Sequence, residues 1–160
     1  MKPAQTIDEP ERREPQRRAG CATRENLGFL LAKASQRWNE LLYERFVAAG
    51  FPDVRASYGS ILVPLFEEDG LRMGELAERA RLSKQTMTTM VRLLERDGLV
   101  ERRADPSDGR AALVLLTERA RSFRPVAEAT LGELDRLVVG KLSTRGRDEV
   151  QAALRLLAGL

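Results

Sequence analysis

The segment from Leu82 to Thr117 places the strongest constraint on the fold of this chain, because it combines helix, turn and strand signals in a fixed order. Ser83 can cap a helix, since its hydroxyl can accept a bond from an unpaired N–H of the first turn. Apolar residues then recur at three- and four-residue spacings, which places them on one helix face: Met87, Met90, Val91 and Leu94. Gly98 is predicted to end this helix, at a position that needs positive φ.

The other face of this predicted helix carries long cations, an amide and hydroxyls. Its members are Lys84, Gln85, Thr86, Thr88, Thr89, Arg92 and Arg96. Side chains of these kinds can donate to phosphates and read base edges in a DNA major groove. Most amphipathic helices have a polar face, however, so this face taken alone favours an ordinary solvated helix.

Two short strands are predicted after the helix, at residues 99–103 and 112–116, with a loop at 104–110. Strong turn formers fill the loop: Pro106, Asp108 and Gly109. A two-stranded ribbon of this size is only marginally stable alone, so it must pack against the helix. Asp108 precedes Arg110 by two residues, and on an extended chain its carboxylate could orient the guanidinium for a narrow minor groove. The alternative is a plain hairpin.

These residues carry a resemblance to a known family. Asp108-Gly109-Arg110, followed after five residues by Leu116-Thr117, resembles the D-x-R-x5-L-T signature of the MarR family of bacterial transcription regulators. The preceding segment resembles the recognition helix and the start of the wing in that family, and the resemblance runs from about Leu27 to the C-terminus. Two positions depart from the pattern. Thr89 stands where many members carry Arg, so base preference should differ, and Ala120 stands where Gly often follows the Leu-Thr.

The resemblance implies repression, often relieved by a small aromatic acid bound between the dimer helices and the winged helix. Trp38 and Tyr58 could line such a cleft, although core packing is the favoured interpretation. Some members sense peroxides through a cysteine in the first helix, but Gly28 stands at that position here. A redox role for Cys21, which lies upstream, is therefore disfavoured and kept as a minor hypothesis.

Apolar periodicity predicts further helices at residues 27–49, 57–68, 73–80 and 117–139, and a last helix that opens at Ser143 or Thr144. Leu71-Arg72 is predicted to be a short strand before the third of these. Pro64 should kink the second helix, and Gly140 should end the fourth. The helix at 73–80 and the helix after Ser83 are joined by a tight turn, so together they make a helix-turn-helix.

The predicted fold class is mainly α with a small β-wing, a winged helix-turn-helix flanked by long N- and C-terminal dimerisation helices. Residues 1–22 are predicted to be a disordered tail, residues 23–52 and 117–160 a helical dimerisation region, and residues 53–116 the DNA-binding domain. The end helices carry more apolar surface than one subunit can cover. A two-fold homodimer would cover it and would place two recognition helices at half-sites about 34–36 Å apart.

Several classes of protein are disfavoured. The chain has no histidine, a single cysteine and no glycine-rich phosphate loop, so catalysis, a zinc site and a cofactor are not expected. Glu67-Glu68-Asp69 is a carboxylate cluster, but a solvated cap at the helix end is the favoured interpretation. No apolar run approaches the ~20 residues that span a membrane, and the charged first residues lack a signal sequence, so a cytoplasmic location is expected.

The sequence therefore predicts a partner, double-stranded DNA, and a set of residues that contact it. These are Ser83, Lys84, Gln85, Thr86, Thr88, Thr89, Arg92, Asp108 and Arg110. Two alternatives stay open. One is a helical protein-interaction module whose winged helix binds a protein partner, which would bind with little dependence on salt. The other is a regulator whose effector pocket is filled, so that DNA binding responds to no small molecule.

Overall fold

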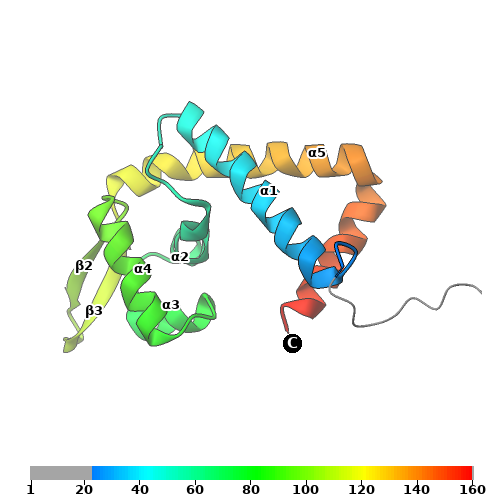
Figure 1. The fold of residues 1–160 in the computed structure, drawn as a ribbon. Helices are drawn as coiled ribbons and strands as arrows, with labels where there is room; N and C mark the ends of the chain where they lie inside the picture. Colours follow the sequence, from blue (N-terminus) through cyan, green and yellow to red (C-terminus); the bar gives the residue numbers. More distant parts are fainter. Residues whose placement is uncertain (1–22, 160) are drawn as a thin grey trace, which may run out of the picture. The chain divides into compact units, whose positions relative to one another are not determined.

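The structure is a computed structural model that describes residues 23–159 of the chain. The predicted tail at residues 1–22, with Cys21, lies outside the described residues. The described elements are α1 (Leu27–Ala48), a 3-10 turn (Ala56–Tyr58), α2 (Gly59–Glu67), β1 (Leu71–Arg72), α3 (Met73–Arg79), α4 (Lys84–Arg96), β2 (Val100–Asp105), β3 (Asp108–Leu116) and α5 (Glu118–Leu157) (Figure 1). The predicted fold class, mainly helical with a small β-wing, is confirmed. The structure comprises two units, residues up to 35 and residues from 36 onward.

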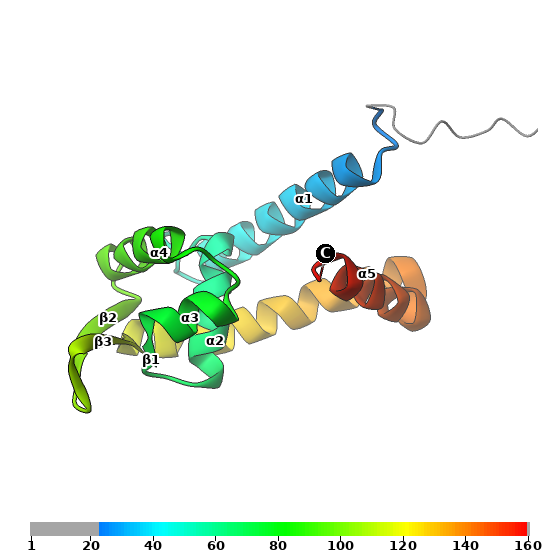
Figure 2. The same ribbon diagram turned by 90° about the horizontal axis from the view of Figure 1, so that it is seen from below.

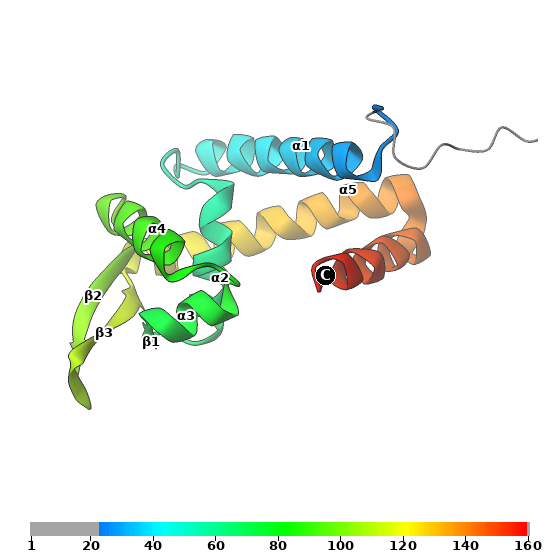
Figure 3. The ribbon, with the colours of Figure 1, turned by 60° about the horizontal axis from the view of Figure 1, so that its bottom comes forward.

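The sheet is a three-stranded antiparallel arrangement in the order β1-β3-β2. Leu71 of β1 pairs with Val114, and Val100 of β2 pairs with Leu116, so β3 is the central strand. The β2–β3 hairpin extends beyond α3 and α4 as a wing (Figure 3). The short strand predicted at Leu71-Arg72 is confirmed, and it ties the wing to the start of α3.

The wing strands are longer than the sequence analysis predicted. The predicted loop at 104–110 was wrong, since β2 continues to Asp105, β3 starts at Asp108, and only Pro106-Ser107 connects them. The reason is a side chain that closes the turn. Asp105 Oδ1 accepts bonds from the amide of Ser107 at 2.8 Å and from its hydroxyl at 2.7 Å, so no further loop residues are needed.

The core of the winged helix gathers α2, α3, α4 and the sheet around aliphatic side chains. Its fully enclosed members include Ile61, Leu62, Leu65, Leu76, Met87, Val91, Leu94, Leu99 and Val114. Burial of each such side chain contributes on the order of 1.5–3 kcal/mol to folding. The predicted interior proline, Pro64, lies inside α2 and is buried with this core. The second half of α1 joins the core through Leu42 and Phe46, and the Phe46 ring meets the ring of Phe123 edge-on at 4.8 Å.

The break in α5 is displaced from its predicted position. Gly140 was predicted to end the helix, but it is helical, and the backbone leaves helical geometry at Ser143 with φ 63° and ψ 169°. Figures 1 and 2 show the sharp turn between the orange and red parts of α5. A glycine costs a helix interior only about 1 kcal/mol, so it ends a helix only where a cap is formed. Here Ser143 supplies the cap, with Oγ accepting from the amide of Gly146 at 3.4 Å, as the prediction of a helix opening at Ser143 requires.

The Ser143 turn divides α5 into a first arm, residues 118–142, and a second arm, residues 144–157. Thr117 caps the first arm, since its hydroxyl accepts from the amide of Ala120 at 3.2 Å. Buried residues occur in the first arm only as far as Leu134. Among the helices of residues 23–159, none is long and apolar enough to cross a membrane.

Candidate DNA-binding surface

The start of α4 is held by a cap and a tight turn. Ser83 is the cap residue, and its hydroxyl accepts from the amide of Thr86 at 3.1 Å, as predicted. Arg81, in the turn from α3, adopts positive φ of 51°, a conformation for which a sequence normally signals glycine. The tight turn between the two helices was predicted from the sequence, but the positive φ of Arg81 was not. The guanidinium of Arg81 donates to the carbonyl of Ala158, so the turn is also joined to the end of the second arm of α5.

The two faces of α4 are those that the sequence predicted. Met87, Val91 and Leu94 are fully enclosed. Gly98 follows the helix with φ 69°, which confirms the predicted end. The polar residues lie at the surface. Thr88 and Glu95 are half-buried. The exposed residues are Ser83, Lys84, Gln85, Thr86, Thr89, Arg92 and Arg96.

Most cations of the winged helix are occupied by carboxylates. Across residues 72–117, all of which the structure describes, ion pairs join Arg72–Asp105, Arg79–Glu68, Arg96–Asp97, Arg102–Glu95 and Arg103–Glu101. Over the same residues, three cations make neither an ion pair nor a side-chain hydrogen bond: Lys84, Arg92 and Arg110. All three are residues that the sequence predicted to contact DNA. Within residues 72–117, positive charge is thus left uncompensated on α4 and on the wing, and Arg81 is bonded to a carbonyl group instead of a carboxylate.

The hydroxyls of α4 are engaged within the helix. Thr88 donates to the carbonyl of Lys84 at 2.8 Å, and Thr89 donates to the carbonyl of Gln85 at 3.1 Å. The hydroxyls of Ser83 and Thr86 lie 2.8 Å apart and bond to each other. Thr88 and Thr89 could donate to DNA only if these internal bonds opened, whereas in the Ser83–Thr86 pair only one of the two hydroxyls gives its proton to the other.

The contact between Asp108 and Arg110 differs from the one expected. Asp108 Oδ1 accepts from the backbone amide of Arg110 at 3.0 Å, and not from the guanidinium. A short carboxylate reaches the amide two residues further along more readily than the end of a long side chain. Asp108 therefore shapes the backbone at the start of β3, and the guanidinium of Arg110 remains without a carboxylate partner.

A buried carboxylate that the sequence analysis missed fixes the wing to β1. Asp105 is 6% exposed, and its Oδ2 accepts from Nε of Arg72 at 2.7 Å and pairs with Nη2 at 2.6 Å. Nη2 of Arg72 also donates to the hydroxyl of Ser107 at 3.2 Å. Bonds from Ser107 and Arg72 lower the pKa of Asp105 to about 2. The Asp-Pro-Ser sequence could have signalled the turn, but the partner Arg72 follows only from the strand pairing.

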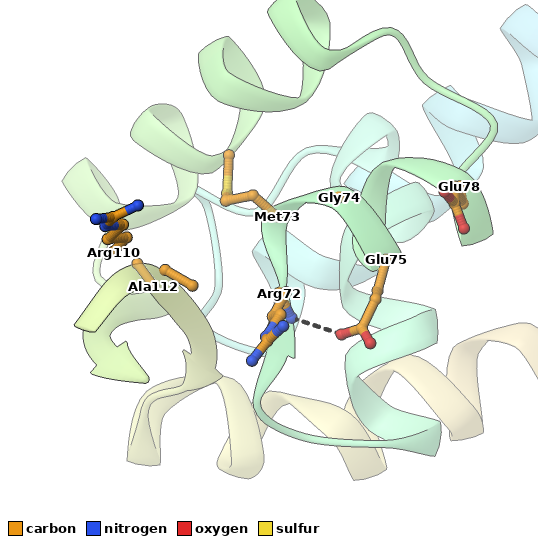
Figure 4. Close-up of a pocket in the computed structure, with 8 residues that line it drawn as sticks. Arg72, Met73, Gly74, Glu75, Glu78, Arg110 and Ala112 are labelled. Atoms are coloured by element: carbon orange, nitrogen blue, oxygen red, sulfur yellow. Dashed lines mark hydrogen bonds between the residues drawn. The ribbon is translucent and has the colours of Figure 1, made fainter. Parts of the chain in front are cut away.

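An open pocket of about 550 Å³ lies between α3 and β3 (Figure 4). Arg110 and Ala112 line it from the wing, whereas Arg72 and Glu75 line it from the start of α3. The amide of Arg72 donates to Glu75 at 3.0 Å, which caps α3. Arg110 thus stands at the rim of a gap between helix and wing, where its guanidinium can reach a ligand outside the protein.

The two aromatic residues considered for an effector cleft pack in the core instead. Tyr58 is 0% exposed, and its hydroxyl donates to Asp97 at 2.5 Å. Burial, followed by the hydrogen bond to Asp97, raises the pKa of Tyr58. Trp38 is partly buried and packs against the same core. Core packing was the interpretation favoured from the sequence, and it is confirmed.

The carboxylates at 67–69 are more engaged than a solvated cap. Glu68 pairs with Arg79 at 2.5 Å. Asp69 accepts from the amide of Leu116 at 2.8 Å and from Arg121 at 2.8 Å, so it joins the turn before β1 to the end of β3. All three carboxylates are exposed at the end of α2, as the predicted solvated cap requires, and Glu68 and Asp69 also bind partners from distant segments.

The family can now be assigned. The MarR family model matches residues 57–112, the span from the 3-10 turn into β3. The HTH-type transcriptional repressor Rv2887 of Mycobacterium tuberculosis is 36% identical over 93 residues, which are 58% of this chain and 67% of that protein. The chain belongs to the MarR family. It is a transcriptional regulator of that family, as the wing signature at Asp108, Arg110 and Leu116-Thr117 predicted.

Solved structures agree with the assignment of this MarR-family regulator. A probable transcriptional regulator from Pseudomonas aeruginosa is 27% identical, with a TM-score of 0.72 over 83% of this chain and 97% of that one. The transcriptional repressor CouR, bound to a 23-mer DNA duplex, is 26% identical, with a TM-score of 0.70 over 84% of this chain and 93% of CouR. Both extend the similarity beyond the winged helix, over most of the described residues.

Proposed function

We propose that this regulator is a repressor that binds an inverted-repeat operator in double-stranded DNA as a homodimer. The observation that carries the proposal is the set of uncompensated cations, Lys84 and Arg92 on α4 and Arg110 on the wing. A cation without a carboxylate partner can neutralise a phosphate with no ion pair to break first. The similarity to CouR, a repressor bound to a DNA duplex, supports DNA as the partner.

In the proposed complex, α4 enters the major groove. Gln85, Thr86, Thr88, Thr89 and Arg92 meet bases or nearby phosphates, while Ser83 and Lys84 meet the phosphate backbone at the start of the helix. Arg110 meets the adjacent minor groove or its backbone, and Asp108 places it through the bond to its amide.

The proposed dimer uses residues 23–52 and 117–160, the helical region outside the winged helix. Large apolar side chains on α5 support this assignment, because they are 41–77% exposed. They are Leu131, Leu137, Leu142, Val150, Leu154 and Leu156. A two-fold partner would cover them and set the separation of the two α4 helices, which would fix half-sites about 34–36 Å apart.

Relief of repression by a small aromatic or phenolic ligand is part of the proposal. Such a ligand would act only if it binds more tightly to a dimer whose α4 helices have the wrong separation for the operator. Tyr58 is excluded as an open lining residue of its site, since the side chain is fully buried.

Selection of genomic DNA fragments by the purified full-length protein, at two salt concentrations, tests the proposal. We expect enrichment of a short inverted repeat, with affinity that falls steeply as salt rises because phosphate contacts release counterions. Binding without an enriched repeat would contradict the proposal that the protein is a sequence-specific repressor. Fragment retention that is indifferent to salt would instead favour a module that binds a protein partner.

A further inference from the structure

The front of α4 is a narrow ridge directly opposite its buried face. Gln85, Thr89 and Arg92 follow one another at spacings of four and three residues and are all exposed. This spacing places them one above another on the helix. Thr89 is the central member of the ridge, between Gln85 and Arg92.

Thr89 is exposed, and its methyl group is the part of the side chain that is not engaged in a hydrogen bond. A threonine hydroxyl has one proton to donate, and here that proton is given to the carbonyl of Gln85 at 3.1 Å. The hydroxyl therefore lies against the backbone of its own helix. Because the substituents on Cβ are staggered, the methyl group takes a separate direction, and it has no polar atom to compete for solvent or for a base.

Gln85, the neighbour of Thr89 on the ridge, carries a side-chain amide that also suits an A·T base pair. The side-chain amide of Gln85 makes no hydrogen bond among the described residues, and it is exposed one turn before Thr89. A glutamine amide can bond an adenine edge at two positions, whereas a methyl group fits against the C5-methyl group of thymine. Both groups thus favour A·T pairs at adjacent positions of a major groove.

We propose that Thr89 is a specificity-determining residue that reads a thymine in each half-site through methyl–methyl contact. This inference rests on the proposed function, because it assumes that α4 enters the major groove. It goes further by assigning one base type to one residue. The hydroxyl of Thr89 stays bonded to the helix in the complex and reads no base.

The test compares wild-type protein with Thr89→Ser and Thr89→Val on the selected operator, in which each thymine is replaced singly by uracil. Uracil removes only the C5-methyl group. Serine keeps the hydroxyl and loses the methyl group, whereas valine keeps the methyl group and loses the hydroxyl. The three residues have similar helix propensities, and thermal unfolding followed by circular dichroism checks that all three proteins fold alike.

At one symmetric thymine position we expect uracil to weaken wild-type binding about fourfold, the factor that corresponds to one buried methyl group. Thr89→Ser should show the same loss on the thymine operator and no further loss with uracil. Thr89→Val should bind the thymine operator within about twofold of wild type and keep the response to uracil.

Two results would overturn the inference. Indifference of wild-type binding to uracil at every position would show that no thymine methyl group is read. Full binding by Thr89→Ser together with weakened binding by Thr89→Val would assign the contact to the hydroxyl. Either result leaves a protein that binds its operator, so it is distinct from failure of the proposed function, in which wild-type protein would select no operator at all.

Discussion

The winged helix and the second arm of α5 leave different kinds of side chain without a partner. The winged helix closes its apolar core completely, with Leu76, Val91 and Leu94 at 0% exposure, and leaves cations uncompensated at its surface. The second arm differs in its large apolar side chains, which are left exposed. Arg145 pairs with Glu149 at 2.9 Å, while Val150 and Leu154 are each 45% exposed.

This difference indicates what each region binds. A surface with free cations and a closed core offers long-range attraction to a polyanion. A helix whose apolar side chains are half exposed gains most from an apolar partner, because burial of that area contributes about 25 cal/mol per Å². The DNA and dimer parts of the proposal therefore rest on separate regions and can be tested separately.

A matched pair of leucine truncations should give the largest contrast. Leu94→Ala removes a fully buried side chain, and we expect a loss of about 2–5 kcal/mol in the free energy of unfolding. Leu154→Ala removes a half-exposed one, and we expect a loss of roughly 1 kcal/mol or less. Urea unfolding at several protein concentrations measures both.

The concentration dependence separates the two regions. The loss from Leu94→Ala should be the same at every protein concentration, whereas the loss from Leu154→Ala should shrink as dimers dissociate on dilution. A Leu154→Ala effect that ignores concentration would mean that the second arm is completed within its own subunit, and the contrast between the regions would fail.

Charge placed on the second arm should separate the subunits without unfolding the winged helix. Val150→Glu with Leu154→Glu puts like charges into the proposed interface, so the mass in solution should fall to that of one chain. Operator affinity should fall on the order of a hundredfold, because the two half-sites are no longer bound by linked modules. Analytical ultracentrifugation and a binding titration measure these effects, and Arg145→Glu, on the paired and 90% exposed side chain, is the control.

Arg110 and Arg103 form a matched pair of exposed wing arginines that differ in pairing. Arg103 contacts Glu101 at 2.5 Å, whereas Arg110 has no carboxylate partner. We expect Arg110→Ala to weaken operator binding by roughly tenfold or more at fixed salt, and Arg103→Ala to change it by much less. Equal losses from the two variants would show that pairing does not mark the DNA-contacting cations.

Asp108→Ala should reproduce part of the Arg110→Ala loss, because Asp108 sets the backbone of Arg110 and not its guanidinium. Affinity titrations of the single and double variants measure this coupling. If Asp108→Ala bound the operator with wild-type affinity, Asp108 would have no positioning role, but the proposed DNA contact of Arg110 would still stand.

Local signals made most of this fold predictable. The cap at Ser83, the apolar spacing from Met87 to Leu94 and the positive-φ glycine at 98 act within a few residues, so α4 was predicted with its ends and its faces. The wing signature identified the family and Arg110, and the polar face of the helix identified the other two cations that the structure leaves unpaired, Lys84 and Arg92.

The features that were missed depend on contacts between distant segments or on backbone choices with no residue signal. Asp105 finds Arg72 only after β1 has paired with β3, and 33 residues separate them in the chain. Arg81 adopts positive φ without being a glycine, and α5 turns at Ser143 and not at Gly140.

The smallest expected effect concerns the carboxylate that anchors the wing. The pKa of Asp105 is lowered from 3.8 to about 2 in the folded chain, so the unfolded chain binds its proton first as the pH falls. The stabilisation that Asp105 provides is therefore fully present above about pH 4 and is lost as the pH falls towards 2. Asp105→Asn should lower stability at neutral pH and flatten its pH dependence within this window.

Chemical unfolding between pH 2 and pH 7 measures that dependence, and Glu101→Gln is the control. Glu101 belongs to the same strand but pairs with Arg103 at the surface, where a salt bridge contributes at most about 1 kcal/mol. Its variant should keep the slope of wild type between pH 4 and 2. If Asp105→Asn kept that slope as well, the bonds from Arg72 and Ser107 would not stabilise the wing, and the wing would be held by the apolar pairing of β1 with β3 alone.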